Sequence, residues 1–121
     1  MIILPLPDKA LWPNGRAHWA TKSRAFAKHK AWARHATMAT LPRCFKHNGE
    51  PIRLRYTVTP KTAHRIDADN AVAAMKAYQD GIALALGVDD NCFAVPEIVF
   101  GKPLKPGGVV VELLAGVGDA D

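Results

Sequence analysis

The residues best suited to chemistry lie in one stretch of the chain, residues 64–92. It opens with two aspartates two positions apart, Asp67 and Asp69, and closes with the pair Asp89 and Asp90. Carboxylates without histidine or cysteine partners suit hard cations such as Mg²⁺ or Mn²⁺, which prefer oxygen ligands. A lysine beside such a cation can offset negative charge on a phosphate or on a leaving oxygen. The stretch therefore predicts a metal-dependent centre that acts on phosphate groups.

A single amphipathic helix is expected between the two acidic pairs. Asp69 or Asn70 suits its N-cap, and Gly87 suits the left-handed position that ends it. A second line along this helix carries Asp69, Lys76 and Asp80, with Lys76 leaning back toward Asp69. The apolar stripe recurs at helical spacing and comprises Ala71, Val72, Met75, Tyr78, Ile82 and Leu86.

The terminal pair lies a full helix length away from Asp67 and Asp69. A strand after Cys92, running beside the strand before Asp67, would bring the pair back toward them. Each feature also has a purely structural interpretation, as an N-cap, an i,i+4 ion pair or a turn. One helix does not require all of them together, so the combination favours the chemical interpretation.

These residues resemble the signature of the RusA-type Holliday junction resolvases, endodeoxyribonucleases of bacteria and phages. That signature is D-x-D-N, a helix lysine, an aspartate one turn later, then G-x-x-D-D. Here it corresponds to Asp67–Asn70, Lys76, Asp80 and Gly87–Asp90, where one residue instead of two separates the glycine from the aspartate pair. Some members place the lysine four residues after the D-N, where this chain has Ala73, but the spacing downstream of Lys76 fits. The resemblance extends loosely from Ile2 to Leu114, including Leu4-Pro5-Leu6-Pro7 and Asn14-Gly15-Arg16-Ala17-His18-Trp19.

The resemblance implies a Mg²⁺-dependent, structure-selective endonuclease, with Mn²⁺ as an alternative metal. It would resolve four-way DNA junctions by paired symmetric nicks during recombination and repair, acting as a homodimer. The catalytic residues it implies are Asp67, Asp69, Lys76 and Asp90. The metal ligands it implies are Asp67, Asp69 and Asp90, with Asp89 as a further candidate.

The basic residues are concentrated in the first half of the chain. Residues 1–66 carry a formal charge of +11, and residues 67–121 carry −6. A basic surface beside an acidic centre suits a protein that binds and cuts a phosphodiester backbone. A solvated basic face and a loop-anchoring role for Trp19 are the structural alternatives. The candidate DNA-binding residues are Arg16, Trp19, Lys22, Arg24, Lys28, Lys61 and Arg65.

The order of elements predicts an α/β (α+β) fold, with a single mixed β-sheet and two main helices packed on it. One domain is expected over residues 1–115, followed by a flexible acidic tail over 116–121. A helix is expected from Thr21 or Ser23 to about Thr40, and a loop over Leu41–Pro51. The expected strands are Ile2–Leu6, Ile52–Thr59, Cys92–Phe100 and Val109–Leu114.

Several other classes of protein have no support in the sequence. No apolar run is long enough to cross a membrane, so a cytoplasmic protein of a bacterial or phage-infected cell is expected. The histidines and cysteines lack the spacing of a zinc site. Two further hypotheses stay open: a non-catalytic protein that binds branched DNA with the family fold, and a phosphohydrolase acting on small substrates. The second leaves the basic half unexplained.

Overall fold

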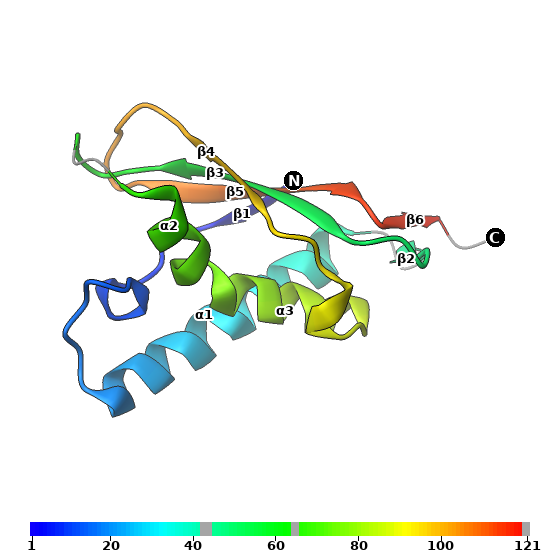
Figure 1. Cartoon of the computed structure of the whole chain (residues 1–121), viewed down its shortest axis with the longest axis horizontal. Coiled ribbons are helices and arrows are strands. Elements are labelled where there is room, and N and C mark those ends of the chain that lie inside the picture. Colours follow the sequence, from blue (N-terminus) through cyan, green and yellow to red (C-terminus); the bar gives the residue numbers. More distant parts are fainter. Residues whose placement is uncertain (42–44, 64–65, 120–121) are drawn as a thin grey trace.

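The computed structural model describes residues 1–41, 45–63 and 66–119, and its framework is a four-stranded sheet with helices on one side (Figure 1). The strand order is β1-β5-β3-β4. Only β3 and β4 are parallel neighbours, so the sheet is mixed as predicted. The strands are β1 (Ile2–Leu4), β3 (Arg53–Thr59), β4 (Glu97–Phe100) and β5 (Gly108–Ala115).

The alternation of apolar and polar residues in β3 decides which face is buried. Leu54, Tyr56 and Val58 are fully buried, while the residues between them face away from the helices and are more exposed. Val109 and Val111 of β5 complete the same buried face. The α+β class and the mixed sheet predicted from the sequence are therefore confirmed.

The first helix, α1 (Trp19–Thr40), begins a few residues earlier than predicted. His18 precedes it and caps it, because the ring Nδ1 accepts a hydrogen bond of 3.2 Å from the backbone N–H of Ala20. The buried positions recur every four residues and are Ala25, His29, Ala33 and Thr37. Trp32 is not on this line, and its side chain is 42% exposed.

The helix predicted between the acidic pairs is divided into α2 (Ala68–Ala74) and α3 (Lys76–Leu86). Met75 lies between them, with φ of −84° and ψ of −1°. The N-cap is Asp67, whose Oδ1 accepts a 3.0 Å hydrogen bond from the N–H of Asp69, so the prediction of Asp69 or Asn70 was wrong. The prediction for Gly87 is confirmed, because it ends α3 with φ of +69°.

Helices α1 and α3 pack against each other at Gly81. A Cβ placed on Gly81 would lie 2.2 Å from the carbonyl oxygen of Lys30 and 2.9 Å from the Cβ of Ala33. These distances leave no room for any side chain at this position. Glycine at position 81 is therefore what allows the backbones of the two helices to meet.

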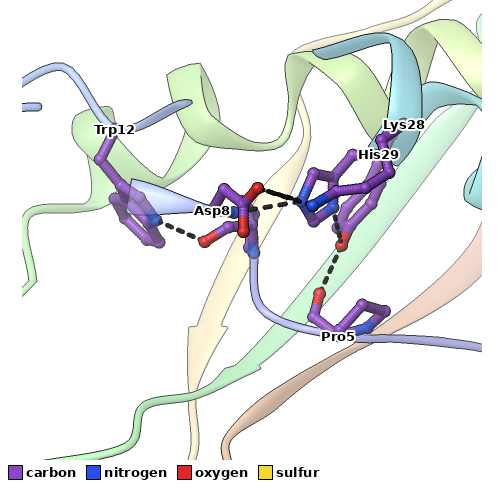
Figure 2. A network of polar contacts seen from close by, with 7 residues as sticks. Pro5, Asp8, Trp12, Lys28 and His29 are labelled. Atoms are coloured by element: carbon purple, nitrogen blue, oxygen red, sulfur yellow. Dashed lines mark hydrogen bonds and ion pairs between the residues drawn. The ribbon is translucent and has the colours of Figure 1, made fainter. Parts of the chain in front are cut away.

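A buried polar network fastens the N-terminal segment to both helices (Figure 2). The hydroxyl of Tyr78 donates to the carbonyl of Pro5 and lies 2.8 Å from Nδ1 of His29. The other ring nitrogen, Nε2, accepts a 3.2 Å hydrogen bond from the backbone N–H of Asp8. The hydroxyl proton is used on Pro5 and Nε2 is an acceptor, so His29 is neutral with its proton on Nδ1. Lys28 pairs with the Asp8 carboxylate at 2.8 Å.

Two regions predicted to lack regular structure contain strands. Within the loop expected over Leu41–Pro51, Phe45–His47 forms β2. Within the tail expected over 116–121, Val117–Asp119 forms β6 and pairs antiparallel with β2. These two strands form a second sheet, so the prediction of a single sheet was wrong. Neither segment alternates clearly over enough residues to stand out in the sequence, and each is stabilised by a partner far away in the chain.

The predicted parallel neighbour of β3 is present, although β4 begins only at Glu97. Before it, Asp90–Cys92 forms the short 3-10 helix η2 instead of the start of the strand. The crossover from β3 through α2 and α3 to β4 thus places Asp89 and Asp90 between the end of α3 and the edge of the sheet.

Candidate nucleic-acid interface and acidic site

Lys76, in the first turn of α3, joins two of the carboxylates singled out in the sequence. Its Nζ lies 3.0 Å from Oδ1 of Asp80 and 2.7 Å from Oδ1 of Asp90. Gln79 donates a further hydrogen bond of 2.9 Å to the same oxygen of Asp90. The i,i+4 spacing on α3 sets the first contact, and the return of the chain through η2 sets the second. Lys76 therefore points toward Asp80 and Asp90, and the prediction that it leans toward Asp69 was wrong.

The charges of this cluster stabilise one another. Burial alone would lower the pKa of Lys76, but its hydrogen bonds to Asp90 and Asp80 outweigh burial and raise it. The hydrogen bond from Lys76, followed by that from Gln79, lowers the pKa of the Asp90 carboxyl. Both groups are consequently charged at neutral pH. The side chain of Lys76 is 44% exposed, so its positive charge is accessible to an anion from solution.

A shallow hollow of about 260 Å³ surrounds this cluster. Asp80, Asp89 and Asp90 contribute carboxylates to its lining, and Lys30 reaches it from α1. Three acidic and two basic residues thus share one surface depression. The formal charge of this lining is −1, so Lys30 and Lys76 are the groups in it that could contact a phosphate.

Asp67 and Asp69 lie apart from this hollow, at the opposite end of the α2–α3 pair. Both side chains are exposed, and Asp67 serves as the N-cap of α2. Within residues 1–41, 45–63 and 66–119, no group of three or more His, Cys, Asp or Glu side chains is arranged to hold a metal ion. The four predicted ligands are thus divided between two places, with Asp67 and Asp69 at the start of α2 and Asp89 and Asp90 beyond the end of α3.

Tyr56, on the buried face of β3, was not identified from the sequence. Its hydroxyl is buried and has no hydrogen-bond partner among the described residues. Burial raises the pKa of this hydroxyl, and the negative charge of nearby Asp80 raises it further. The sequence does not indicate that the Tyr56 hydroxyl lies near Asp80, because that proximity depends on how α3 packs on the sheet.

A larger groove lies on the other side of Lys30. Its volume is about 660 Å³, and three aromatic side chains, Trp12, Trp19 and Phe26, contribute to its walls. Lys22 and Lys30 supply positive charge. The Trp19 side chain is 75% exposed, although aromatic residues of this size usually contribute to a core. We call this depression, lined by these five residues, the aromatic groove.

Trp12 also lines a second depression, of about 330 Å³. Lys9, Lys61 and Ile66 belong to that lining. The indole N–H of Trp12 donates a 3.1 Å hydrogen bond to the carbonyl of Pro7, which holds the ring in place (Figure 2). Trp12 therefore shares each of the two depressions with two lysines.

The predicted DNA-binding residues are only partly brought together. Trp19 and Lys22 line the aromatic groove, and Lys61 lines the adjacent depression. Arg16 and Arg24 are exposed but line neither, and Lys28 is paired with Asp8 and lies over the Trp32 ring. Arg65 lies outside the described residues.

Lys9 and Trp12 were not predicted as site residues, and Lys30 was predicted only as one of the basic residues on the face of its helix that could contact phosphates. A signal for Lys30 was present, because Lys22, Phe26 and Lys30 are spaced four residues apart and share one face of a helix. Trp12 and Lys9 are placed by the short 3-10 helix η1 (Lys9–Leu11) and the turn after it, which the sequence pattern does not define.

In the part of the chain that the structure describes, no helix is long and apolar enough to span a membrane. A comparison with known protein families finds no match. A curated protein from Xylella fastidiosa (strain Temecula1) is 33% identical over 116 residues, which cover 93% of this chain and 74% of that protein. It is described only as an uncharacterized protein.

Proposed function

Because this chain belongs to the same family as the uncharacterized Xylella fastidiosa protein, whose description names no activity, we propose a function from the site itself. The protein is proposed to be a structure-selective endodeoxyribonuclease of the RusA type, acting as a homodimer on four-way DNA junctions. Its setting would be the cytoplasm of a bacterial or phage-infected cell. The observation that carries the proposal is that Lys30 lines both the aromatic groove and the acidic hollow.

This shared lysine supports a continuous path for one DNA strand. Lys22 and Lys30 are available for backbone phosphates, whose neutralisation dominates the affinity of proteins for DNA. A strand lying along this path would bring a phosphate from Lys30 to Lys76, beside Asp80 and Asp90. Lys76 is charged and accessible, so it can bind a non-bridging oxygen and stabilise charge that develops on the phosphate.

A requirement for Mg²⁺, or for Mn²⁺, is part of this proposal and rests on the resemblance to the RusA-type enzymes. Among the residues that the structure describes, no three or more His, Cys, Asp or Glu side chains are grouped to hold a metal ion. The roles proposed for Asp67, Asp69, Asp89 and Asp90 as ligands, and for Asp67, Asp69 and Asp90 in catalysis, have the same basis.

A non-catalytic protein that binds branched DNA is the second candidate, and one observation favours it. Asp80 and Asp90 are paired with Lys76, and Asp67 caps α2, so three of the acidic residues have structural roles. Both candidates predict binding to junction DNA. Only the first predicts a cut.

The test uses a labelled synthetic four-way junction with Mg²⁺ or with EDTA. We expect paired symmetric nicks that depend on Mg²⁺ and are lost in Asp69→Asn and Asp90→Asn, while both variants still bind the junction. Glu50→Gln is the matched control, since Glu50 is an exposed acidic residue on the turn before β3 and outside both depressions.

Tight binding without a cut in Mg²⁺ or Mn²⁺ would support the non-catalytic candidate. Loss of binding and cutting together in Asp69→Asn would show that the residue serves the fold instead of the chemistry.

A further inference from the structure

The residues that line the aromatic groove suit the binding of a nucleotide, but not of a nucleotide that is paired and stacked in a duplex. In a duplex the faces of each base are covered by its neighbours in the stack, so an aromatic side chain has access only to a base that is unpaired or extruded. The groove offers the faces of aromatic side chains together with lysines. Its volume of about 660 Å³ falls within the usual range of ligand pockets.

Trp19 is the side chain best placed to receive a base. It is 75% exposed, and its ring contacts the ring of His18 in a tilted arrangement with 5.5 Å between centroids. It stands in the first turn of α1, where the capped start of the helix fixes the backbone beneath it. A tryptophan that is held in place but left in water does not contribute to the core, and its open face is available for stacking.

Charge complementarity specifies the rest of the ligand. Lys22 and Lys30 lie four residues before and after Phe26 on one face of α1, so cations flank the aromatic floor. Lys9 and Lys61 lie beyond Trp12 in the adjacent depression. Along α1 the order is Trp19, Lys22, Phe26 and Lys30, so a base on Trp19 would be followed by two cations placed to contact the next backbone phosphates.

We propose that the aromatic groove binds an unpaired nucleobase of a DNA strand, stacked on Trp19, with the backbone phosphates on one side of that base lying on Lys22 and Lys30. The inference rests on the proposed function and adds the part of the substrate that is recognised. A strand held in this way would present its next phosphate to Lys76 and Asp90, because Lys30 lies between the two sites. Branched DNA, in which bases at the branch point can unstack, would then be preferred over an uninterrupted duplex.

The test compares two single strands of equal length in EDTA, by fluorescence anisotropy. One is a thymidine oligonucleotide, and the other is an abasic strand with the same number of phosphates. We expect the thymidine strand to bind about tenfold more tightly, which is the scale of stacking one base on an aromatic side chain. Trp19→Ala should remove this preference and leave the weaker, salt-sensitive binding to phosphate.

Trp32→Ala is the matched control, because Trp32 is an exposed tryptophan of the same helix but lies outside the groove. This variant should keep the preference for the thymidine strand. Trp19→Phe should retain most of it, and Trp19→Leu should lose it. If circular dichroism shows that Trp19→Ala is unfolded, the comparison of Trp19→Phe with Trp19→Leu decides whether the base stacks on the side chain at position 19.

Equal affinity of the wild type for both strands would overturn this inference and leave the proposed nuclease intact. Absence of binding to either strand and to the junction would overturn both. Free thymidine monophosphate that competes as well as the strand would assign the groove to a mononucleotide and overturn the inference. The inference would also be overturned if the Trp19→Ala variant changed its oligomeric mass but kept the preference for the thymidine strand. The groove would then be a contact between subunits.

Discussion

Gly81 controls how closely α1 and α3 approach, and replacing it with alanine tests the packing directly. The added Cβ would lie 2.2 Å from the carbonyl oxygen of Lys30, 2.9 Å from the Cβ of Ala33 and 2.9 Å from the backbone nitrogen of Arg34. Two of these three atoms belong to the backbone, so the clash is relieved only if one helix moves away from the other.

Two opposing terms set the expected size of the effect. Alanine is better than glycine inside a helix by about 1 kcal/mol. Overpacking typically costs about 1–3 kcal/mol, and contact with backbone atoms places this site at about 3 kcal/mol. Gly81→Ala should therefore lower the free energy of unfolding by about 2 kcal/mol. For a chain of this size that corresponds to a fall in Tm of roughly 8 °C.

Urea unfolding followed by circular dichroism measures this change. Gly118→Ala is the matched control, because a Cβ on Gly118 would meet no atom within 4 Å and its φ is not positive. The control should unfold within about 0.5 kcal/mol of the wild type. A Gly81→Ala variant as stable as the wild type, or more stable, would refute the close approach of α1 and α3.

The remaining predictions concern the buried network and the acidic hollow. Burial lowers the pKa of His29 in the folded chain, and the unfolded chain binds this proton more readily, so stability should fall as pH drops below about 6.5. His29→Gln should flatten that part of a urea-unfolding profile against pH, and an unchanged slope would contradict the role of His29. Tyr78→Phe leaves a carbonyl and a ring N–H without their buried partner, so chemical unfolding should show a loss of about 1–3 kcal/mol. In Lys76→Met, NMR titration should show the pKa of Asp90 rising toward its ordinary value, because its strongest hydrogen bond is lost. A pKa that stays low would assign the effect to another group.

The parts of the fold that the sequence predicted are those with strong local patterns. The alternation over Arg53–Thr59 defined β3, and Gly87 defined the end of α3, because each signal depends on only a few neighbouring residues. The strands β2 and β6 escaped prediction because a three-residue strand is specified by its partner. Phe45 is paired with Asp119, more than seventy positions away in the chain.

The site was predictable in its residue types more than in its geometry. Lys76, Asp80, Asp89 and Asp90 were expected together and do line one hollow. Asp67 and Asp69 were expected with them and do not, since α2 separates them from that hollow and the Asp67 side chain is used as a cap. Helix periodicity predicts which residues share a face, but it does not predict which distant carboxylate a lysine pairs with.

Neighbouring residues of α3 connect the packing of the helices with the proposed function. Asp80 faces the acidic hollow, while Gly81, the next residue, contacts the backbone of Lys30. The separation between the aromatic groove and the acidic hollow is therefore fixed by a helix–helix contact and not by a loop. A change that moves the helices apart would shift Lys30 relative to Lys76 while leaving every charged side chain in place. Under conditions where Gly81→Ala is fully folded, it should therefore impair cutting of the junction more than binding, because catalysis is sensitive to displacements of about 1 Å.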